Sequence, residues 1–595
     1  MSSTYAHYQI PASLPSDYAI LSRYTPAVDD QENDDEPNDT YDAGISCRRG
    51  SFPTSYSGRP LRPTMGSAPS PSALVSEQNT EFTPLLGIHE MAPPNLNDLP
   101  TQGIPLVTPD EDEQATFWHL VMQELPVLAK FSLPVFGTHL LEYTLVVASV
   151  ISIGHLSTTA LAAITLGSMT ASVTGLSIIQ GFTSALDTML PSAWTSDQPE
   201  LVGLWSQRMG VVMAFCLVPI YAIWFNAESI LLFLKQDPEV ARLAALYLKW
   251  MSLGLPAYAL NAISRRYFQS QGLFTVPTRI ILVVAPLNIV LNYFLVWGPS
   301  WCRLGFIGAP LSTAISFNVI AVLSVIYGIF YTSPVAWYPV GRRSFTNLGV
   351  LVQLGLAGVA QTSSEWWAWE LVSLAASLLG PVVLACQSVL LVSASSTFQA
   401  PFALSVATSV RIGNLLGEGH ARRAEVSAMA AVLLSLVVSA ISSALFMIFK
   451  NKWAYIFNSD PEVVSLVSSM MPLLALFQVF DGITAITGGV FRARGKQFTG
   501  ALLNLSAYYV FGIPLGIWLC FSFNLGLHGL WLGLTFALIY CSIAGLALTW
   551  NTDWHHEQRK AAARVEAERL AQLQERHSKR HSTILEADEE APLLS

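Results

Sequence analysis

The stretch FQSQGLFT, Phe268–Thr275, returns later in the chain as FRARGKQFT, Phe491–Thr499. Both begin with phenylalanine, have a glycine four residues on, and carry a Phe-Thr pair shortly after it. A second pair of stretches follows in the same order, LGFIG at Leu304–Gly308 and LGLHG at Leu525–Gly529. The offsets, 223 and 221 residues, are nearly equal. This regularity predicts a chain made of two similar halves.

The composition is that of a membrane protein. Of the 595 residues, 52% are hydrophobic and only 12% are charged, whereas a soluble domain carries roughly a quarter charged residues. Residues 1–115 differ, because they are rich in Ser, Pro, Asp and Asn and include the acidic run DDQENDDEPND, Asp29–Asp39. Such a segment cannot bury enough apolar surface to offset its chain entropy. We therefore expect residues 1–115 to form a disordered cytosolic tail.

Apolar runs long enough to cross a bilayer recur along the rest of the chain. A spanning helix needs about 20 mainly apolar residues. Twelve such runs are predicted, centred near residues 143, 172, 218, 252, 287, 319, 363, 394, 438, 476, 511 and 538. With six runs each, the halves share one orientation in the membrane. The prediction is an all-α polytopic membrane protein with 12 transmembrane helices in two six-helix bundles related by pseudo-two-fold symmetry, residues 120–335 and 345–550.

The distribution of basic residues sets the predicted orientation. If both tails are cytosolic, twelve Arg and Lys residues fall in cytosolic loops and five in outer loops, as the positive-inside rule favours. The twelve are Arg208, Arg265, Arg266, Arg279, Arg342, Arg343, Arg411, Arg422, Arg423, Arg492, Arg494 and Lys496, and the five are Lys235, Arg242, Arg303, Lys450 and Lys452. Residues 551–595 are predicted to form a polar, solvated cytosolic helix, with contact to a membrane surface as the alternative.

Five acidic residues fall inside the predicted spans, where a charged side chain is costly and marks a pathway or a partner. They are Glu142, Asp187, Glu365, Glu370 and Asp481. Burial disfavours the charged form of a carboxyl group, so a buried acid can bind and release a proton near neutral pH. We expect Glu365, Glu370 and Asp481 to bind protons and substrate. Asp187 is expected to be a structural anchor, paired with a basic residue such as Arg411.

The spacing of these acids along the chain predicts which of them share a helix face and which occupy equivalent places in the two halves. Glu365 and Glu370 are five residues apart, so on a helix they point about 140° apart and could flank a curved cavity without sharing one stripe. Gln361 lies one turn before Glu365 and shares its face. Glu142 lies 223 residues before Glu365, at the equivalent place in the first half. For Glu142, a role in binding and a role as a buried anchor both stay open.

Three tryptophans surround the two acids in the segment EWWAWE. Their ring faces attract organic cations, by up to about 2 kcal/mol when the pair is desolvated. Tryptophans at the ends of spans usually form an interfacial belt, but Trp366, Trp367 and Trp369 lie near the middle of theirs. We expect Trp366 and Trp369 to contact substrate.

Signals for enzymes and metal sites are weak. The six cysteines show no metal-ligand spacing. The stretch GGVFRARGKQ, Gly488–Gln497, resembles a phosphate-binding loop only superficially, because its glycine spacing is one residue too long and Gln497 stands where Ser or Thr would hold magnesium. We expect no enzymatic activity, no metal, no cofactor and no nucleic-acid partner.

The combination of features resembles one family of membrane proteins. The segments GHLSTTALAAITL, SALDT, EWWAWE, SVRIGNLLGEGHARRA and GGVFRARGKQFTGALLNLSAYYVFGIPLG are similar to eukaryotic multidrug and toxin extrusion (MATE) transporters, over residues 120–550, and the acidic tails resemble those of fungal members. The resemblance implies proton-coupled antiport that exports organic cations, drugs, toxins or metabolites from the cytosol by alternating access. It also implies binding roles for Glu365, Glu370 and Asp481, with the proton gradient as the energy source.

The sequence departs from the family pattern at three places. A family acid in the eighth helix falls near Val392, the usual GQAYGA is PSAWTS at Pro191–Ser196, and Glu142 stands where relatives often carry Gln. Two alternatives remain. A flippase for lipids or lipid-linked sugars would need a groove lined by cationic side chains, whereas the charged residues in the predicted spans are acidic. A non-transporting receptor or scaffold is disfavoured by the duplication and the paired acids.

Two short motifs concern delivery within the cell. The stretches EFTPLL, Glu81–Leu86, and EEAPLL, Glu589–Leu594, each place an acid four residues before a Leu-Leu pair. They resemble acidic dileucine signals, so sorting adaptors are candidate partners at Leu85/Leu86 and Leu593/Leu594. The expected location is a vacuolar or endosomal membrane or the plasma membrane. The other expected partners are small cationic or amphipathic molecules, protons and membrane lipids.

Overall fold

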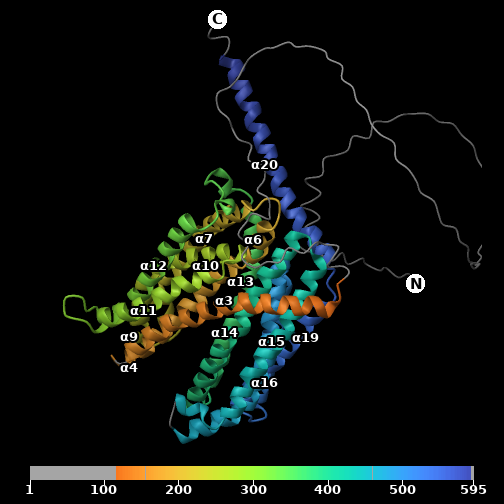
Figure 1. Cartoon of the computed structure of the whole chain (residues 1–595). Helices are drawn as coiled ribbons and strands as arrows, with labels where there is room; N and C mark the ends of the chain where they lie inside the picture. Colours follow the sequence, from red (N-terminus) through yellow and green to blue (C-terminus); the bar gives the residue numbers. More distant parts are fainter. Residues whose placement is uncertain (1–114, 155, 458–459, 591–595) are drawn as a thin grey trace, which may run out of the picture. The chain divides into compact units, whose positions relative to one another are not determined.

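The described part of the chain is almost entirely helical. The computed structural model describes residues 115–154, 156–457 and 460–590, all within one unit, Pro100–Ser595 (Figure 1). The predicted tail before residue 115 and both predicted dileucine pairs, Leu85/Leu86 and Leu593/Leu594, lie outside the described residues. The helices fall into an N-terminal half, α3 to α12, and a C-terminal half, α13 to α19, which α20 follows.

The described part of the N-terminal half contains ten α-helices. These are α3 (Phe117–Gly154), α4 (Thr158–Ala171), α5 (Ser177–Thr183), α6 (Leu186–Trp194), α7 (Leu201–Phe225), α8 (Ala227–Phe233), α9 (Pro238–Met251), α10 (Leu255–Ser270), α11 (Thr275–Trp297) and α12 (Gly308–Tyr331). A π-helical turn, Ser172–Leu176, joins α4 to α5, and a 3-10 turn, Arg342–Phe345, precedes the second half.

The C-terminal half is built from longer, less interrupted helices. These are α13 (Leu348–Ser377), α14 (Pro381–Glu418), α15 (Ala421–Phe449), α16 (Pro461–Arg494), α17 (Gln497–Leu505), α18 (Ile513–Phe521) and α19 (Leu527–Trp550). A π-helical segment, Ser506–Gly512, joins α17 to α18. The last helix, α20 (Trp554–Glu590), leaves the end of α19 after a short turn.

Eleven stretches of helix within the described residues are long and apolar enough to cross a membrane. The predicted span near residue 363 is not among them. It corresponds to α13, which is 30 residues long and so could cross about 30 Å of hydrocarbon. However, Glu365, Glu370 and its Ser, Thr and Gln side chains make α13 more polar than the other eleven. Apolarity alone therefore does not identify α13, the helix that carries Glu365 and Glu370, as a membrane span.

The predicted repeat is visible in the backbone. Gly272 follows the end of α10 after one residue, Gln271, and has a φ of 76°, and Gly495 directly follows α16 with a φ of 73°. A left-handed residue at this position ends a helix, and glycine takes it without a steric penalty. The repeated glycine of FQSQG and FRARG therefore performs the same structural task in both halves.

The first helix connects the two halves. In its first turns, α3 packs on α14 and α15, and further along it packs on α11 and α12 (Figure 1). Glu124 of α3 is fully buried and accepts hydrogen bonds from Arg411 of α14, at 2.8 and 2.7 Å, and from Arg423 of α15, at 2.6 Å. On the other side, Thr138 of α3 is 2.9 Å from Thr278 of α11, oxygen to oxygen. One ion-pair cluster and one hydroxyl contact thus fix α3 to both halves.

The divergent stretch PSAWTS, Pro191–Ser196, lies at a close contact between the halves. A Cβ added at Gly413 of α14 would lie 2.7 Å from Pro191, and one added at Gly417 would lie 2.3 Å from Thr195. The Thr195 hydroxyl also donates to the Asn414 carbonyl oxygen at 2.7 Å. In this chain, the two glycines of α14 therefore allow the close approach of α6 and α14.

The C-terminal tail is helical as predicted, but the prediction that it is solvated is wrong for its first half. The helix α20 contacts α6, α14 and α15, and Trp554, Glu557, Ala561 and Glu568 are buried. Only two of these four residues are apolar, so hydrophobic periodicity could not reveal the buried face. We call the helix ends that meet α20, namely the C-terminal ends of α14 and α16 and the N-terminal ends of α13 and α15, the α20 end.

Replacing Glu124 with glutamine should destabilise the fold strongly. The change removes the carboxylate that Arg411 and Arg423 share in a fully buried place. Breaking a buried ion pair from one side costs about 3–5 kcal/mol, because charge is left behind without compensation. We expect a loss of that size in the free energy of unfolding of Glu124→Gln, measured in detergent micelles.

The matched control is Glu425→Gln, because Glu425 lies exposed on α15, two residues from Arg423. Exposed substitutions usually change stability by less than about 0.5 kcal/mol. Equal stabilities of Glu124→Gln and Glu425→Gln would contradict the role assigned to the buried cluster.

Candidate functional site

Four helices of the C-terminal half enclose a cavity of 80 Å³. The cavity is lined by Gln361, Thr362, Glu365 and Trp366 of α13, by Phe398, Phe402 and Ser405 of α14, by Asp481, Thr484, Ala485, Thr487, Gly488, Phe491 and Arg492 of α16, and by Gly500, Leu503 and Asn504 of α17. It is far smaller than the pockets of about 300–1,000 Å³ that hold drug-sized ligands. A ligand of that size therefore requires the cavity to widen.

Two predicted acids from different helices line this cavity together. Glu365 is on α13 and Asp481 is on α16, where 5% of the Asp481 surface is exposed. Among the described residues, no side chain or backbone group makes an ion pair or hydrogen bond to either carboxylate. Each is therefore available to a proton or to a cationic ligand, at a depth where an unpaired carboxylate is strongly disfavoured.

Two other acids of the predicted spans, Glu142 and Asp187, differ from the cavity acids because each forms an ion pair with arginine. Glu142 of α3 forms an ion pair with Arg265 of α10, and its other oxygen is 3.5 Å from Nδ1 of His139. It lies outside the cavity. The acid at the equivalent place of the first half is thus held by a neighbouring arginine, whereas Glu365 is not.

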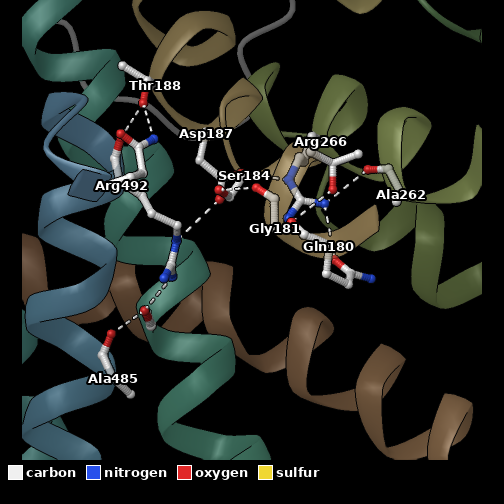
Figure 2. Close-up of polar contacts among 12 residues, drawn as sticks. Gln180, Gly181, Ser184, Asp187, Thr188, Ala262, Arg266, Ala485 and Arg492 are labelled. Atoms are coloured by element: carbon white, nitrogen blue, oxygen red, sulfur yellow. Dashed lines mark hydrogen bonds and ion pairs between the residues drawn. The ribbon is translucent and has the colours of Figure 1, made fainter. Parts of the chain in front are cut away.

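Asp187 pairs across the two halves, but not with Arg411 as predicted. Its carboxylate is 2.9 Å from Nε of Arg266, on α10, and 3.3 Å from Nε of Arg492, on α16 (Figure 2). Arg411 is instead bound to Glu124. Its partners, Arg266 and Arg492, are 79 and 305 residues away from Asp187 in the sequence. Helical spacing cannot predict ion pairs between residues so far apart in the chain.

Arg492 belongs both to the cavity wall and to the contact between the halves. Its side chain pairs with Asp187 of the N-terminal half (Figure 2). It also donates a hydrogen bond of 2.8 Å from Nη2 to Ser405 of α14. Its carbonyl oxygen accepts a hydrogen bond from Thr188 of α6. From the sequence, Arg492 is predicted only to be a cation of a cytosolic loop, although its place in the repeated FRARG stretch is a signal for a further role.

Gln361 lines the cavity on the same face of α13 as Glu365, as the spacing predicts. Its backbone carbonyl accepts a hydrogen bond of 3.1 Å from the Asn504 amide of α17. Its side-chain amide lies against Gly500, where an added Cβ would be 2.7 Å from Nε2. A side chain at position 500 would therefore displace the Gln361 amide.

The remaining predicted residues are distributed around α13. Trp366 lines the cavity, whereas Trp369 packs edge-on against Phe477 and Trp531, with ring centroids 5.5 and 5.6 Å away. Glu370 is half-buried outside the cavity, in accord with the expected angle from Glu365. The binding roles of Trp369, Glu370 and Glu142 stay predictions, because no contact in the described residues tests them.

The comparison with protein families matches the chain twice. The MatE family model matches residues 134–294 and 359–518, one segment in each half. The two matches together cover more than half of the chain, and they coincide with the duplication seen in the sequence and the backbone.

Several curated relatives share most of the chain. An uncharacterized transporter of Schizosaccharomyces pombe is 35% identical over 522 residues, which is 84% of this chain and 97% of that protein. Multidrug and toxin extrusion protein 2 of Mus musculus is 33% identical over 446 residues, 75% of this chain and 77% of that protein.

Solved structures resemble the described helices. The eukaryotic MATE transporter AtDTX14 has a TM-score of 0.71 at 30% sequence identity, covering 75% of this chain and 100% of that one. A Vibrio cholerae MATE transporter, the VcmN D35N mutant, has a TM-score of 0.67 at 16% identity and so shows the fold alone. The chain is an integral, multi-pass membrane protein, it is a transporter and not an enzyme, and it belongs to the MatE family.

Proposed function

We propose that this transporter is a proton-coupled antiporter that exports organic cations from the cytosol, including drugs, toxins or metabolites. The proposal rests on one observation: two carboxylates, those of Glu365 and Asp481, line one cavity without an ion-pair partner among the described residues. A buried carboxylate can be neutralised by a proton or by a cationic ligand. Competition of the two for the same oxygens couples their movements, with the proton gradient as the energy source and without a cofactor.

The lining supports a cationic or amphipathic cargo. Trp366, Phe398 and Phe402 offer aromatic surfaces beside the two acids. Aromatic faces attract cations, most strongly where water is excluded. A molecule with an apolar body and one positive charge satisfies both kinds of group. The names of the multidrug and toxin extrusion relatives are consistent with such a range of cargo.

We assign the α20 end to the cytosol, together with both tails. Several of the twelve basic residues that favoured this orientation make ion pairs or hydrogen bonds at the α20 end, among them Arg208, Arg343, Arg411, Arg422, Arg423 and Arg494. Between this end and the cavity acids stand Arg492 and its partner Asp187. The described arrangement is therefore closed on the proposed cytosolic side.

The proposed cycle follows from the order of the acids along α13. Glu370 lies five residues farther from the α20 end than Glu365, about 7.5 Å along the helix. A proton entering from the outer side would reach Glu370 first, and then Glu365 or Asp481. Neutralisation of the cavity acids releases the cargo outward. Rocking of the halves then exposes the cavity to the cytosol, where proton loss restores its affinity for a cation.

A Glu365→Gln variant should fold but lose coupled exchange. Glutamine has nearly the same shape, but it cannot ionise, so it neither binds a proton reversibly nor attracts a cation as a carboxylate does. In acid-loaded proteoliposomes, we expect uptake of radiolabelled tetraethylammonium to fall at least about tenfold, as the loss of one charged contact of about 1.4 kcal/mol or more implies.

Glu462→Gln serves as the control, because Glu462 is exposed at the start of α16, far along that helix from Asp481. Its uptake should match that of the unsubstituted protein. If Glu365→Gln protein still exchanged tetraethylammonium for protons at the normal rate, the proposed function would be wrong.

Replacing Asp187 with asparagine should open the cytosolic side. Asp187→Asn removes the one carboxylate that holds Arg266 and Arg492 together across the halves. We expect stability to fall by roughly 3 kcal/mol. A cysteine at the cavity position Thr487 should also react faster with a membrane-impermeant maleimide from the cytosolic side, relative to the same chain without that cysteine.

The matched substitution is Asp197→Asn, because Asp197 is exposed shortly after α6. It should leave both the stability and the reaction rate unchanged. An unchanged maleimide rate in the Asp187→Asn protein would show that this ion pair does not close the cytosolic side.

A lipid or lipid-linked sugar flippase remains the second candidate function. The same proteoliposomes distinguish it, because a flippase would move a fluorescent lipid between leaflets without proton movement. The family match does not support the other alternative, a non-transporting receptor or scaffold. We retain a vacuolar or endosomal membrane, or the plasma membrane, as the proposed location. The dileucine pairs that suggest sorting adaptors lie outside the described residues.

A further inference from the structure

The C-terminal helix α20 has a buried face that the proposed transport cycle does not use. Trp554, Glu557, Ala561 and Glu568 are each at most 4% exposed. Their spacing, three, four and seven residues, places them on one side of the helix. Two of the four are carboxylates, and burying a carboxylate is unfavourable unless a partner compensates it. Each of the two carboxylates has such a partner, and the two partners belong to different halves.

The start of α20 is fixed to the C-terminal half by several kinds of contact. Glu557 is 3.2 Å from Nη2 of Arg494, at the end of α16. The same guanidinium lies over the Trp554 ring, 5.7 Å from its centroid. Arg564 donates a hydrogen bond of 3.3 Å to the Arg494 carbonyl oxygen. Trp554 and Ala561 also join an apolar cluster with Ile412, Leu415 and Leu416 of α14.

The middle of α20 reaches the N-terminal half through a polar contact. Glu568 is 2.8 Å from Nη2 of Arg208, on α7, and both side chains are almost fully buried. Its second oxygen accepts a hydrogen bond of 3.3 Å from Asn347, just before α13. Arg208 is in turn held by the Arg343 carbonyl oxygen and by the Thr346 hydroxyl. The N-terminal half therefore meets this part of α20 through charge and hydrogen bonds.

The two ion pairs are joined by a stiff element. Glu557 and Glu568 are eleven residues apart, which on an α-helix is about 16 Å. While both pairs are made, Arg494 of one half and Arg208 of the other are held at a fixed separation. Rocking of the halves changes that separation, so one of the two pairs has to break when the α20 end opens.

We propose that α20 is a latch that holds the α20 end closed and releases the N-terminal half, at Glu568 and Arg208, when the transporter opens on that side. The proposal rests on alternating access as the proposed function. The C-terminal half keeps the helix, because apolar packing and a cation–π contact support its ion pair. The Glu568 contact is the point of release, because it is made by polar groups alone.

The test compares Glu568→Gln with Glu566→Gln, two residues away on the same helix. Glu566 is exposed and pairs with Arg569, at 3.6 Å. The readout is the rate at which Thr487→Cys, in the cavity wall, reacts with a membrane-impermeant maleimide from the α20 side, without cargo or pH gradient. Glu568→Gln should react at least about fivefold faster, a shift typical of losing one favourable contact. Glu566→Gln should react at the original rate.

A charge exchange separates loss of the latch from damage to the fold. In the double variant Arg208→Glu, Glu568→Arg, the pair can form again with reversed charges, so the slow rate should return. An unchanged rate in Glu568→Gln overturns the proposal. A faster rate that the exchange does not restore also overturns it, because the effect would then come from a disturbed Arg208 site. Faster reaction in Glu557→Gln alone would overturn the assignment of the release point.

The outcome is independent of the test of proton coupling. The maleimide rate reports only whether the α20 end is open, so the latch can be present even if Glu365 carries no proton. Conversely, coupled uptake could be normal in the unsubstituted protein while Glu568→Gln leaves the maleimide rate unchanged. The proposed function would then stand, and the latch would be ruled out.

Discussion

Arg492 places one positive charge where the cavity of the C-terminal half meets the contact between the halves. The cavity and this contact together carry three acids, Asp187, Glu365 and Asp481, and one further cation, Arg266. With every group ionised, three negative charges face two positive ones, which leaves one negative charge uncompensated in a region shielded from water. Such an imbalance is strongly unfavourable in a medium of low dielectric. One proton or one monovalent organic cation restores the balance, and the charge inventory therefore matches an exchange of these two species.

The same constraint explains why acids in the helical part of the chain differ in their surroundings. Glu124 and Asp187 are each held by two arginines, and these contacts join elements that are far apart in the chain. An acid bound in this way has a fixed counter-charge and cannot exchange it without disrupting the packing. Glu365 and Asp481 face the cavity instead. Pairing thus separates acids that maintain the structure from acids that are available to ligands, a distinction that residue type alone could not make.

Local features were predictable from the sequence, and long-range partners were not. The repeat, the common face of Gln361 and Glu365, and their separation from Glu370 all follow from helical periodicity and a constant offset. The partners of Asp187 and Glu124 depend on how helices hundreds of residues apart pack together. The buried face of α20 was missed for a related reason, since Glu557 and Glu568 look like solvent-exposed residues until Arg494 and Arg208 are brought against them.

The duplication also accounts for the asymmetry of the site. Equivalent places in the two halves carry Glu142 and Glu365, and the first is neutralised by Arg265 of its own half. In the proposed cycle, the two similar halves rock against each other around the site between them. Coupling has a different requirement, because a second free acid in the N-terminal half would add another uncompensated charge. In the proposed cycle, the arginine that holds Glu142 leaves the exchangeable charge in the C-terminal half alone, next to Arg492 and the contact proposed to open.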